Sequence, residues 1–186
     1  MFDLCVAALL LIPLGVFVAA LLPVNLLLNK GPLFFVQSRM GYGCRPFMAI
    51  KFRTMTGASG TARGAFDALE TERITALGRW LRITRIDELP QIINVLRGEM
   101  SLIGPRPDAY DHARVYLREI PGYAARHSVL PGISGYAQTE LGYADGRDAF
   151  CRKVMADRHY IAHSSFGFDL WIVWRTLVVV LTRRGA

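Results

Sequence analysis

The chain has 186 residues, enough for one domain with a substantial core, and 52% of them are hydrophobic. Its net charge of +7 is carried by dispersed basic residues without a recognised nucleic-acid motif, so a nucleic-acid-binding surface ranks well behind a membrane surface. Cys5, Cys44 and Cys151 stand far apart without C-x-x-C spacing. This pattern argues against a disulfide framework or a zinc site and suits a reducing cytosol.

The first predicted element is an uncharged apolar segment, Leu4 to Leu28, long enough to cross a bilayer. It lacks the basic start and the small-residue cleavage site of a signal peptide, so we expect it to attach the chain to a membrane. Pro13 and Pro23 each remove a helical hydrogen bond, and Pro13 is expected to bend or break the helix. A simple span and a hairpin that enters and leaves by one face both fit this composition. The basic residues that follow favour the cytoplasmic face for the rest of the chain.

Two short strands are predicted next, over residues 33–37 and 46–53, with a glycine-containing turn around 41–43 between them. Residues 57–68 are rich in Gly and Ala and predict a surface loop.

Helices then dominate the pattern. They are expected over residues 71–82, 87–98, 108–120 and 147–163. Gly98 is a typical residue to end the second, and Asp108 and Asp148 are expected to open the third and fourth. Residues 130–140 are predicted to be irregular and then strand-like.

A strongly apolar helix is predicted over residues 166–186, with two tryptophans and terminal arginines. Asp169 and Arg175 make it a poor membrane span. A position at the headgroup level suits it, and a buried core helix fits the periodicity equally well. The whole pattern predicts a mixed α/β, helix-rich small domain on a membrane surface.

The adjacent acids Asp87 and Glu88 stand where an apolar helix begins. They could cap that helix and complement its dipole, or they could be working groups of an active site. Arg79, Arg82 and Arg85 at three-residue spacing are expected to share one helical face that leads to them.

More cations are expected near the acid pair. Arg106 lies between two prolines that restrict its backbone, and Lys51 and Arg53 point to the same side of a strand by period two. Carboxylates ringed by cations suggest an acidic substrate, with the acids on a divalent cation and the cations on phosphate oxygens. Ordinary salt bridges would produce the same spacing.

The stretch from Asp87 to Pro107, DELPQ…NVLRGEMSLIGPRP, resembles the signature of bacterial sugar transferases, the monotopic polyprenyl-phosphate phosphoglycosyl transferases. The similarity covers nearly the whole chain in the family's order. It includes FFVQSRMG (34–41), AIKFRTM (49–55), GRWLR (78–82), LPGISGYAQ (130–138) and FDLWIVWRTLVVVLTRRG (168–185).

This resemblance implies transfer of a sugar 1-phosphate from a UDP-sugar to undecaprenyl phosphate, with Mg²⁺, giving undecaprenyl-diphospho-sugar and UMP. It implies a membrane-inserted helix over residues 1–30, re-entrant at Pro13, and a cytoplasmic catalytic domain over residues 31–186 at the bacterial inner membrane. Homo-oligomerisation is left open.

The resemblance also implies roles for individual residues. Asp87 is the expected nucleophile, forming a covalent phospho-sugar intermediate, and Glu88 acts beside it, with both acids as candidate Mg²⁺ ligands. The expected substrate-binding residues are Lys51, Arg82, Arg106 and Gln138. Arg53, Arg79 and Arg85 are left undecided.

Some positions depart from the family or have no assigned role. Leu130 stands where the family has Arg, and residues 140–142 read E-L-G instead of N-G-R, so a catalytically degenerate membrane scaffold is the main alternative. A lipid-phosphate hydrolase that uses the same aspartate is a third. The four histidines show no ligand spacing and are expected mostly at the surface.

Two further pairs of polar residues are each three residues apart on a predicted helix. Gln91 and Asn94 are expected to be structural, and Asp157 and Tyr160 match the family's D-x-x-Y without an assigned role.

Overall fold

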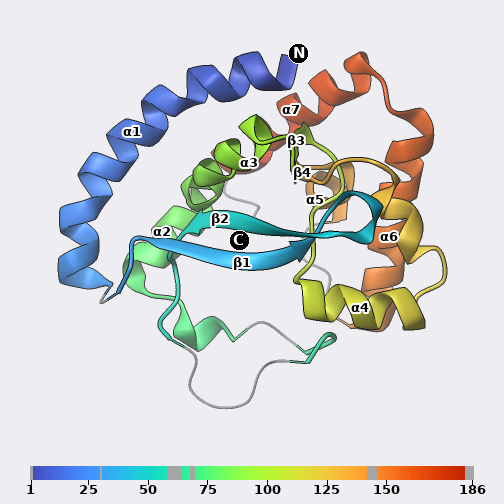
Figure 1. The fold of residues 1–186 in the computed structure, drawn as a ribbon, viewed down its shortest axis with the longest axis horizontal. Coiled ribbons are helices and arrows are strands. Elements are labelled where there is room, and N and C mark those ends of the chain that lie inside the picture. Colours follow the sequence, from blue (N-terminus) through green and yellow to red (C-terminus); the bar gives the residue numbers. More distant parts are fainter. Residues whose placement is uncertain (1, 30, 58–63, 68–69, 142–145, 183–186) are drawn as a thin grey trace.

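A computed structural model describes residues 2–29, 31–57, 64–67, 70–141 and 146–182 (Figure 1). Its α-helices are α1 (Phe2–Leu28), α2 (Ala76–Ile83), α3 (Ile92–Leu96), α4 (Tyr110–Glu119), α5 (Tyr136–Leu141), α6 (Arg147–His163) and α7 (Phe166–Leu181). Its strands are β1 (Phe34–Met40), β2 (Pro46–Phe52), β3 (Ser101–Ile103) and β4 (Gly132–Ser134). Short 3₁₀ helices are η1 (Tyr42–Cys44), η2 (Thr71–Arg73), η3 (Ile86–Gln91) and η4 (Tyr123–Ser128). The predicted helix-rich α/β class is confirmed.

The apolar N-terminal segment is one continuous helix, α1, that includes both Pro13 and Pro23. It follows a curved path along the edge of the molecule rather than folding back as a hairpin (Figure 1). Ala7, Leu14 and Leu21, seven residues apart, are buried on its inner side. The outer side is exposed and apolar, so α1 packs on the domain through a narrow stripe only.

Both ends of α1 are hydrogen-bonded to the rest of the chain. Near its start, the Asp3 carboxylate accepts from the Ser101 hydroxyl at 2.5 Å. Just after its end, the Asn29 side-chain amide donates to the Arg53 carbonyl at 2.9 Å. Both ends of α1 are therefore attached to the same folded domain.

The predicted hairpin is confirmed, because β1 pairs with β2 in antiparallel register with Val36 opposite Ile50. β1 extends to Met40, three residues beyond the predicted strand, because its pairing continues as far as Pro46. η1 occupies the predicted turn, where Gly43 adopts a φ of +62°. Most of the predicted loop at 57–68 lies outside the described residues.

The helix predicted over 71–82 begins later than expected. Thr75 caps α2, its hydroxyl accepting from the Gly78 N–H at 2.9 Å, and Ile74 forms a bridge to Met55 in extended conformation. Residues 71–73 form the separate 3₁₀ helix η2, so the predicted helix is interrupted at the extended Ile74 and not absent before it. The next predicted helix is divided into η3 and α3, and Gly98 follows it with a φ of +73°, as expected.

Two further predictions are corrected in the second half. Asp108 does not cap α4, which begins at Tyr110, because its carboxylate instead accepts from Lys153 and the Tyr123 hydroxyl. Residues 136–141 form α5 rather than a strand, because β4 pairs only with the three-residue β3 and the chain turns into a helix after Gly135.

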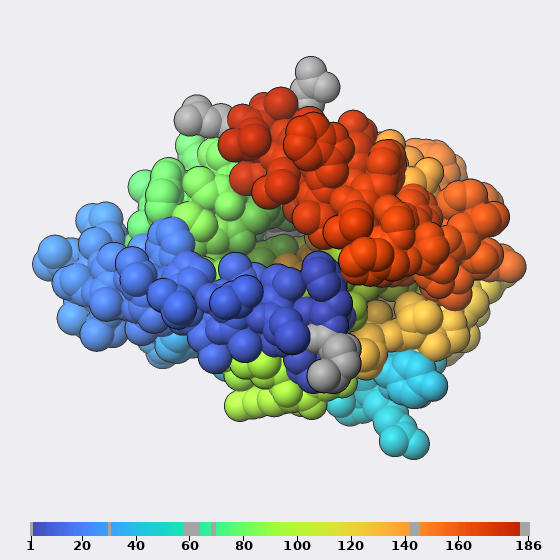
Figure 2. Space-filling view, turned by 90° about the horizontal axis from the view of Figure 1, so that it is seen from above, coloured from blue at the N-terminus to red at the C-terminus, as the bar shows by residue number. Residues whose placement is uncertain are grey.

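The two most apolar helices, α1 and α7, occupy one face of the molecule (Figure 2). Their N-terminal ends meet at the rings of Phe2 and Phe166, whose centroids are 5.5 Å apart. In α7, Ile172 is buried, whereas Trp171 and Trp174 are exposed. The helix is therefore partly packed, and neither a fully buried core helix nor a detached one.

Candidate active site

The acid pair lies on η3, which packs against β2 in the interior of the domain. Asp87 and Glu88 are 7% and 4% exposed. Arg85, just before η3, takes a left-handed φ of +59°, and its side chain forms no hydrogen bond that caps the start of this helix. Pro90 removes a further backbone donor, which favours a short 3₁₀ segment over a regular α-helix. The pair is thus a buried feature and not a helix cap.

Glu88 is held by two cations from distant parts of the chain. Lys51 Nζ of β2 donates to Oε1 at 2.7 Å, and Arg106 donates to Oε2 at 3.0 Å and also to Oε1. Burial alone would raise the pKa of Glu88, but the charges and hydrogen bonds of Arg106 and Lys51 hold it well below its usual range. Glu88 is therefore an anion with both oxygens occupied.

Asp87 differs from its neighbour in its hydrogen bonds and in the direction of its pKa shift. Among the described residues, its Oδ1 has no hydrogen-bond partner although it is buried. Burial and the adjacent Glu88 carboxylate raise the pKa of Asp87, and the charges of Lys51, Arg106 and Arg82 oppose this only in part. An approaching cation or phosphate-bound metal would therefore favour the ionised form of this carboxyl.

A narrow cleft beside Glu88, too tight for a water-sized molecule, is lined by cations. Arg39, Lys51 and Arg106 contribute to its wall, together with Gln91. Burial and the charge of Arg106 lower the pKa of Lys51 to about 8. Clustered cations of this kind are suited to phosphate oxygens. Sequence reasoning did not single out Arg39 for this role, although its segment was part of the family resemblance.

The other expected site residues are placed differently. Arg82 Nε donates to the Thr54 hydroxyl at 3.0 Å, and its charge acts on Asp87. Gln138 is on α5 and donates to the Ile133 carbonyl at 3.4 Å; within the described residues, no hydrogen bond joins it to the acid pair. The structure thus brings Asp87, Glu88, Lys51 and Arg106 together, with Arg82 nearby.

The undecided arginines do not complete this cluster. The shared face predicted for Arg79, Arg82 and Arg85 does not form, because α2 ends at Ile83. Arg79 is exposed, and Arg53 lies against Gly31 near the end of α1.

Neighbouring polar residues have structural contacts. Asn94 is fully buried, accepts from the Ile50 N–H at 3.1 Å and donates to the Met48 carbonyl at 2.8 Å, as expected for a structural residue. Asp157 bonds Arg126, and the Tyr160 hydroxyl donates to Asp169 at 2.8 Å. Of the histidines, which were expected mostly at the surface or interface, His159 and His163 are exposed and His127 is buried. Arg126, beside His127, was not singled out because no pattern marks a single basic residue as buried.

Few side chains in the described part of the chain are available to bind a metal ion. Within the described residues, there is no group of three or more His, Cys, Asp or Glu side chains that could hold an ion. Mg²⁺ needs few protein carboxylates when phosphates supply other ligands, and the open Oδ1 of Asp87 fits that requirement. Glu88 fits less well, because Lys51 and Arg106 already occupy both of its oxygens.

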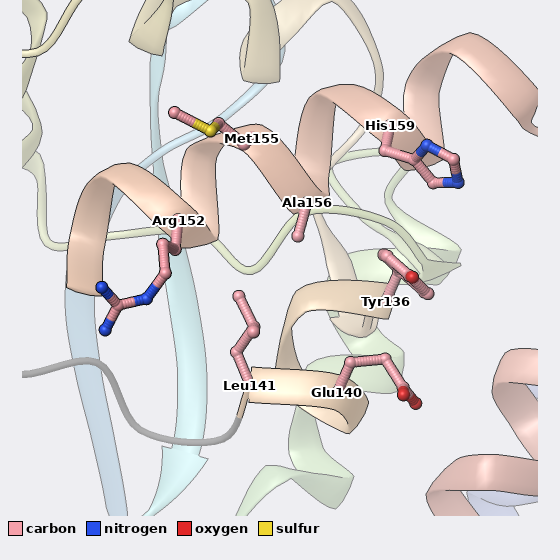
Figure 3. Close-up of a pocket in the computed structure, with 7 residues that line it drawn as sticks. All are labelled: Tyr136, Glu140, Leu141, Arg152, Met155, Ala156 and His159. Atoms are coloured by element: carbon pink, nitrogen blue, oxygen red, sulfur yellow. The ribbon is translucent and has the colours of Figure 1, made fainter. Parts of the chain in front are cut away.

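A separate groove of about 320 Å³ opens between α5 and α6 (Figure 3). Figure 3 shows Leu141 and Ala156 facing one another across it, with Arg152 and Glu140 at opposite ends. Its wall is mainly apolar and includes neither acid of the pair. It is therefore less suited to phosphate chemistry than the cleft of cations beside Glu88.

Comparison with known proteins gives a consistent result. The family described as bacterial sugar transferase matches residues 1–183. A UDP-N-acetylgalactosamine-undecaprenyl-phosphate N-acetylgalactosaminephosphotransferase of Aeromonas hydrophila is 44% identical over 85% of this chain and 37% of its own length. An undecaprenyl-phosphate glucose phosphotransferase of Komagataeibacter xylinus is 39% identical over 100% of this chain and 36% of its own length.

A third relative, a UDP-glucose:undecaprenyl-phosphate glucose-1-phosphate transferase of Caulobacter vibrioides, is 42% identical over 85% of this chain and 60% of its own length. The chain thus spans between about a third and three fifths of these relatives.

Proposed function

Because this chain belongs to the bacterial sugar transferase family, we propose that it transfers a sugar 1-phosphate from a UDP-sugar to undecaprenyl phosphate, initiating exopolysaccharide or glycoconjugate synthesis. The observation that carries this proposal is the asymmetry of the buried acid pair. Glu88 is neutralised by Lys51 and Arg106, while Oδ1 of Asp87 has no hydrogen-bond partner among the described residues. The names of relatives that match over most of this chain support the same reaction class.

In the first step, an oxygen of the Asp87 carboxylate attacks the β-phosphorus of the UDP-sugar. The bond from that phosphorus to the bridging oxygen breaks, UMP leaves, and an aspartyl phospho-sugar forms. In the second step, a phosphate oxygen of undecaprenyl phosphate attacks the same phosphorus. The acyl–phosphate bond breaks, the product leaves as undecaprenyl-diphospho-sugar, and the carboxylate is restored. Covalent catalysis divides one difficult transfer into two easier ones.

The cations of the cleft serve the phosphates in this scheme. Arg106 and Lys51 hold Glu88 and lie where they can contact phosphate oxygens, and Arg82 adds positive charge near Asp87. Asp87 would hold Mg²⁺ together with the substrate phosphates, with Glu88 in support; the ion supplies neutralisation of phosphate charge. Gln138 is proposed to contact the donor sugar from α5.

We further propose that the domain sits on the cytoplasmic face of the bacterial inner membrane, with α1 inserted from that side. α1 is the described helix that is long and apolar enough to cross a membrane. Its two ends are bonded to one body through Asp3 and Asn29, which supports entry and exit by the same face. The exposed apolar side chains of α1 and α7 share the face shown in Figure 2, which supports a common lipid contact.

The test uses purified protein in nanodiscs with undecaprenyl phosphate, Mg²⁺ and a panel of UDP-sugars, with UMP release as the readout. Asp87→Asn keeps the shape and removes the nucleophile, so UMP release is expected to fall by at least about a thousandfold. Release that depends on lipid and Mg²⁺ and is lost in the variant supports the proposal and names the sugar.

Other outcomes are equally informative. Release from no donor would favour the scaffold alternative, and release without any lipid acceptor would favour a hydrolase. Unchanged release in Asp87→Asn would contradict the assigned nucleophile.

A further inference from the structure

The segment Gly104–Asp108, which carries Arg106, is held in place by hydrogen bonds that other parts of the chain donate to its main-chain carbonyl groups. Two of its residues are prolines and lack an N–H, so it has few backbone donors with which to bond itself. Instead, four consecutive carbonyl oxygens each accept from another part of the chain. For Pro105, Arg106, Pro107 and Asp108 in order, the donors are Gly132 N at 3.0 Å, Arg126 Nη2 at 2.9 Å, Arg39 Nη1 at 2.8 Å and Met40 N at 3.1 Å.

Arg126 is the deeply buried side chain among these donors, with 1% exposure. Its remaining donors bind two carboxylates: Nε donates to Asp157 Oδ2 of α6 at 2.7 Å, and Nη1 donates to Asp108. Lys153, also on α6, donates to the other oxygen of Asp108 at 3.0 Å. Arg126 therefore joins η4 and α6 directly to the main chain of Arg106.

This network has no net charge, since Arg126 and Lys153 balance Asp108 and Asp157. A buried ionic group of this kind contributes little net stability compared with apolar residues of similar volume. Its directional hydrogen bonds do, however, define positions to within tenths of an ångström. The position that Arg126 defines is the carbonyl of the residue whose guanidinium forms two hydrogen bonds with Glu88.

We propose that Arg126, held by Asp157, is a positioning residue that fixes the backbone of Arg106 and so directs the Arg106 guanidinium onto Glu88 and an incoming phosphate. This inference rests on the proposed phosphoglycosyl transfer for its kinetic effect, and it adds to that function two residues remote from the acid pair. The path runs from Asp157 through Arg126 and the Arg106 carbonyl to the Arg106 side chain. Neither Arg126 nor Asp157 touches substrate in this scheme.

The experiment compares Arg126→Lys, Asp157→Asn and Tyr123→Phe. The lysine keeps the charge, but its single nitrogen cannot replace the three separate nitrogens with which Arg126 donates to Asp157, Asp108 and the Arg106 carbonyl. The asparagine keeps the shape and weakens the hydrogen bond from Arg126 Nε. Tyr123→Phe is the matched control: it deletes one hydrogen bond to Asp108 in the same network and keeps the ring, whose centroid lies 5.1 Å from Arg126 Cζ. It leaves the bond to the Arg106 carbonyl in place.

Both positioning variants are expected to lower kcat for UMP release by about ten- to a hundredfold, with a smaller change in KM, because misplacement of a group by about an ångström has effects of this size. Tyr123→Phe is expected to stay within about twofold. In an Arg106→Ala background, Arg126→Lys should cost less than about twofold, because the group that it positions is gone.

If Arg126→Lys lowered kcat equally in the wild-type and Arg106→Ala backgrounds, the proposal would be overturned. The same holds if Tyr123→Phe lowered kcat as much as Arg126→Lys, since both results would indicate a general loss of stability. Amide hydrogen exchange of the peptide covering residues 103–108 gives a readout that does not need activity: it should rise in Arg126→Lys and not in Tyr123→Phe. If the wild type releases no UMP, the proposed function is wrong, and this exchange comparison alone decides whether Arg126 fixes the segment.

Discussion

Two neighbouring carboxylates can have opposite properties when cations form hydrogen bonds with both oxygens of one and an oxygen of the other has no hydrogen-bond partner among the described residues. Glu88 is buried with Lys51 and Arg106 on its oxygens, and its pKa is held low. Asp87, one residue away, is buried with an open oxygen and a raised pKa. Charge compensation of one acid concentrates the reactivity on the other, since a carboxylate already held by cations is a poor nucleophile.

At the same scale, His127 should make stability depend on pH. Burial and then the charge of Arg126 lower its pKa to about 4, against an ordinary value near 6.5. Below pH 6.5 the unfolded chain binds a proton here that the folded chain does not, so stability is lost as the pH falls from 6.5 towards 4. The loss attributable to this ring is on the order of 2 kcal/mol.

The measurement is the free energy of unfolding by urea at pH 7 and pH 5 in detergent, for the wild type and His127→Phe. The phenyl ring keeps the volume and cannot titrate, so the difference between the two pH values should shrink in the variant. An unchanged difference would show that His127 is protonated in the folded state as readily as in the unfolded state.

At the scale of elements, helix α2 depends on a close approach that only glycine allows. A Cβ at Gly78 would lie 2.0 Å from the Thr54 carbonyl oxygen, which is backbone and cannot rotate away. Gly78→Ala should therefore push α2 from the end of β2, break the bond from Arg82 to Thr54 and destabilise the fold by about 1–3 kcal/mol. UMP release should also fall in Gly78→Ala, because Arg82 would be displaced.

Gly167 in α7 is the control, because a Cβ there meets nothing within 4 Å. Gly167→Ala should be neutral or stabilising by up to about 1 kcal/mol, since alanine is the better helix former. Thermal unfolding and UMP release of the two variants test the comparison, and equal behaviour of both would mean that the approach of α2 to Thr54 is not required.

At the scale of the whole molecule, the arrangement of α1 makes a specific topology testable. Cys5, Cys44 and Cys151 are replaced by serine, and single cysteines are placed at Phe2 or at Tyr42, which are both exposed. A membrane-impermeant maleimide should label both from the same side, in inverted vesicles and not in intact spheroplasts. Tyr42→Cys reports the side of the catalytic domain. Labelling of Phe2→Cys from the periplasmic side alone would contradict the re-entrant topology.

Much of the architecture was already determined by local sequence. The apolar run produced α1, the alternation and the turn glycines produced the β1–β2 hairpin, and Gly98 ended its helix as predicted. The acid pair, Lys51 and Arg106 could be named in advance, because they belong to motifs of the family, whereas Arg39 of the cleft was not singled out.

Tertiary structure alone decided how these residues are used. Lys51 and Arg106 meet Glu88 across 37 and 18 residues of chain, and Arg126 meets Asp157 across 31. Periodicity and capping describe neighbours within a turn or two, so they assigned Asp108 to a helix cap when it binds Lys153 instead. Which acid is paired and which stays open is set by burial and long-range hydrogen bonds, and these arise only when the segments pack together.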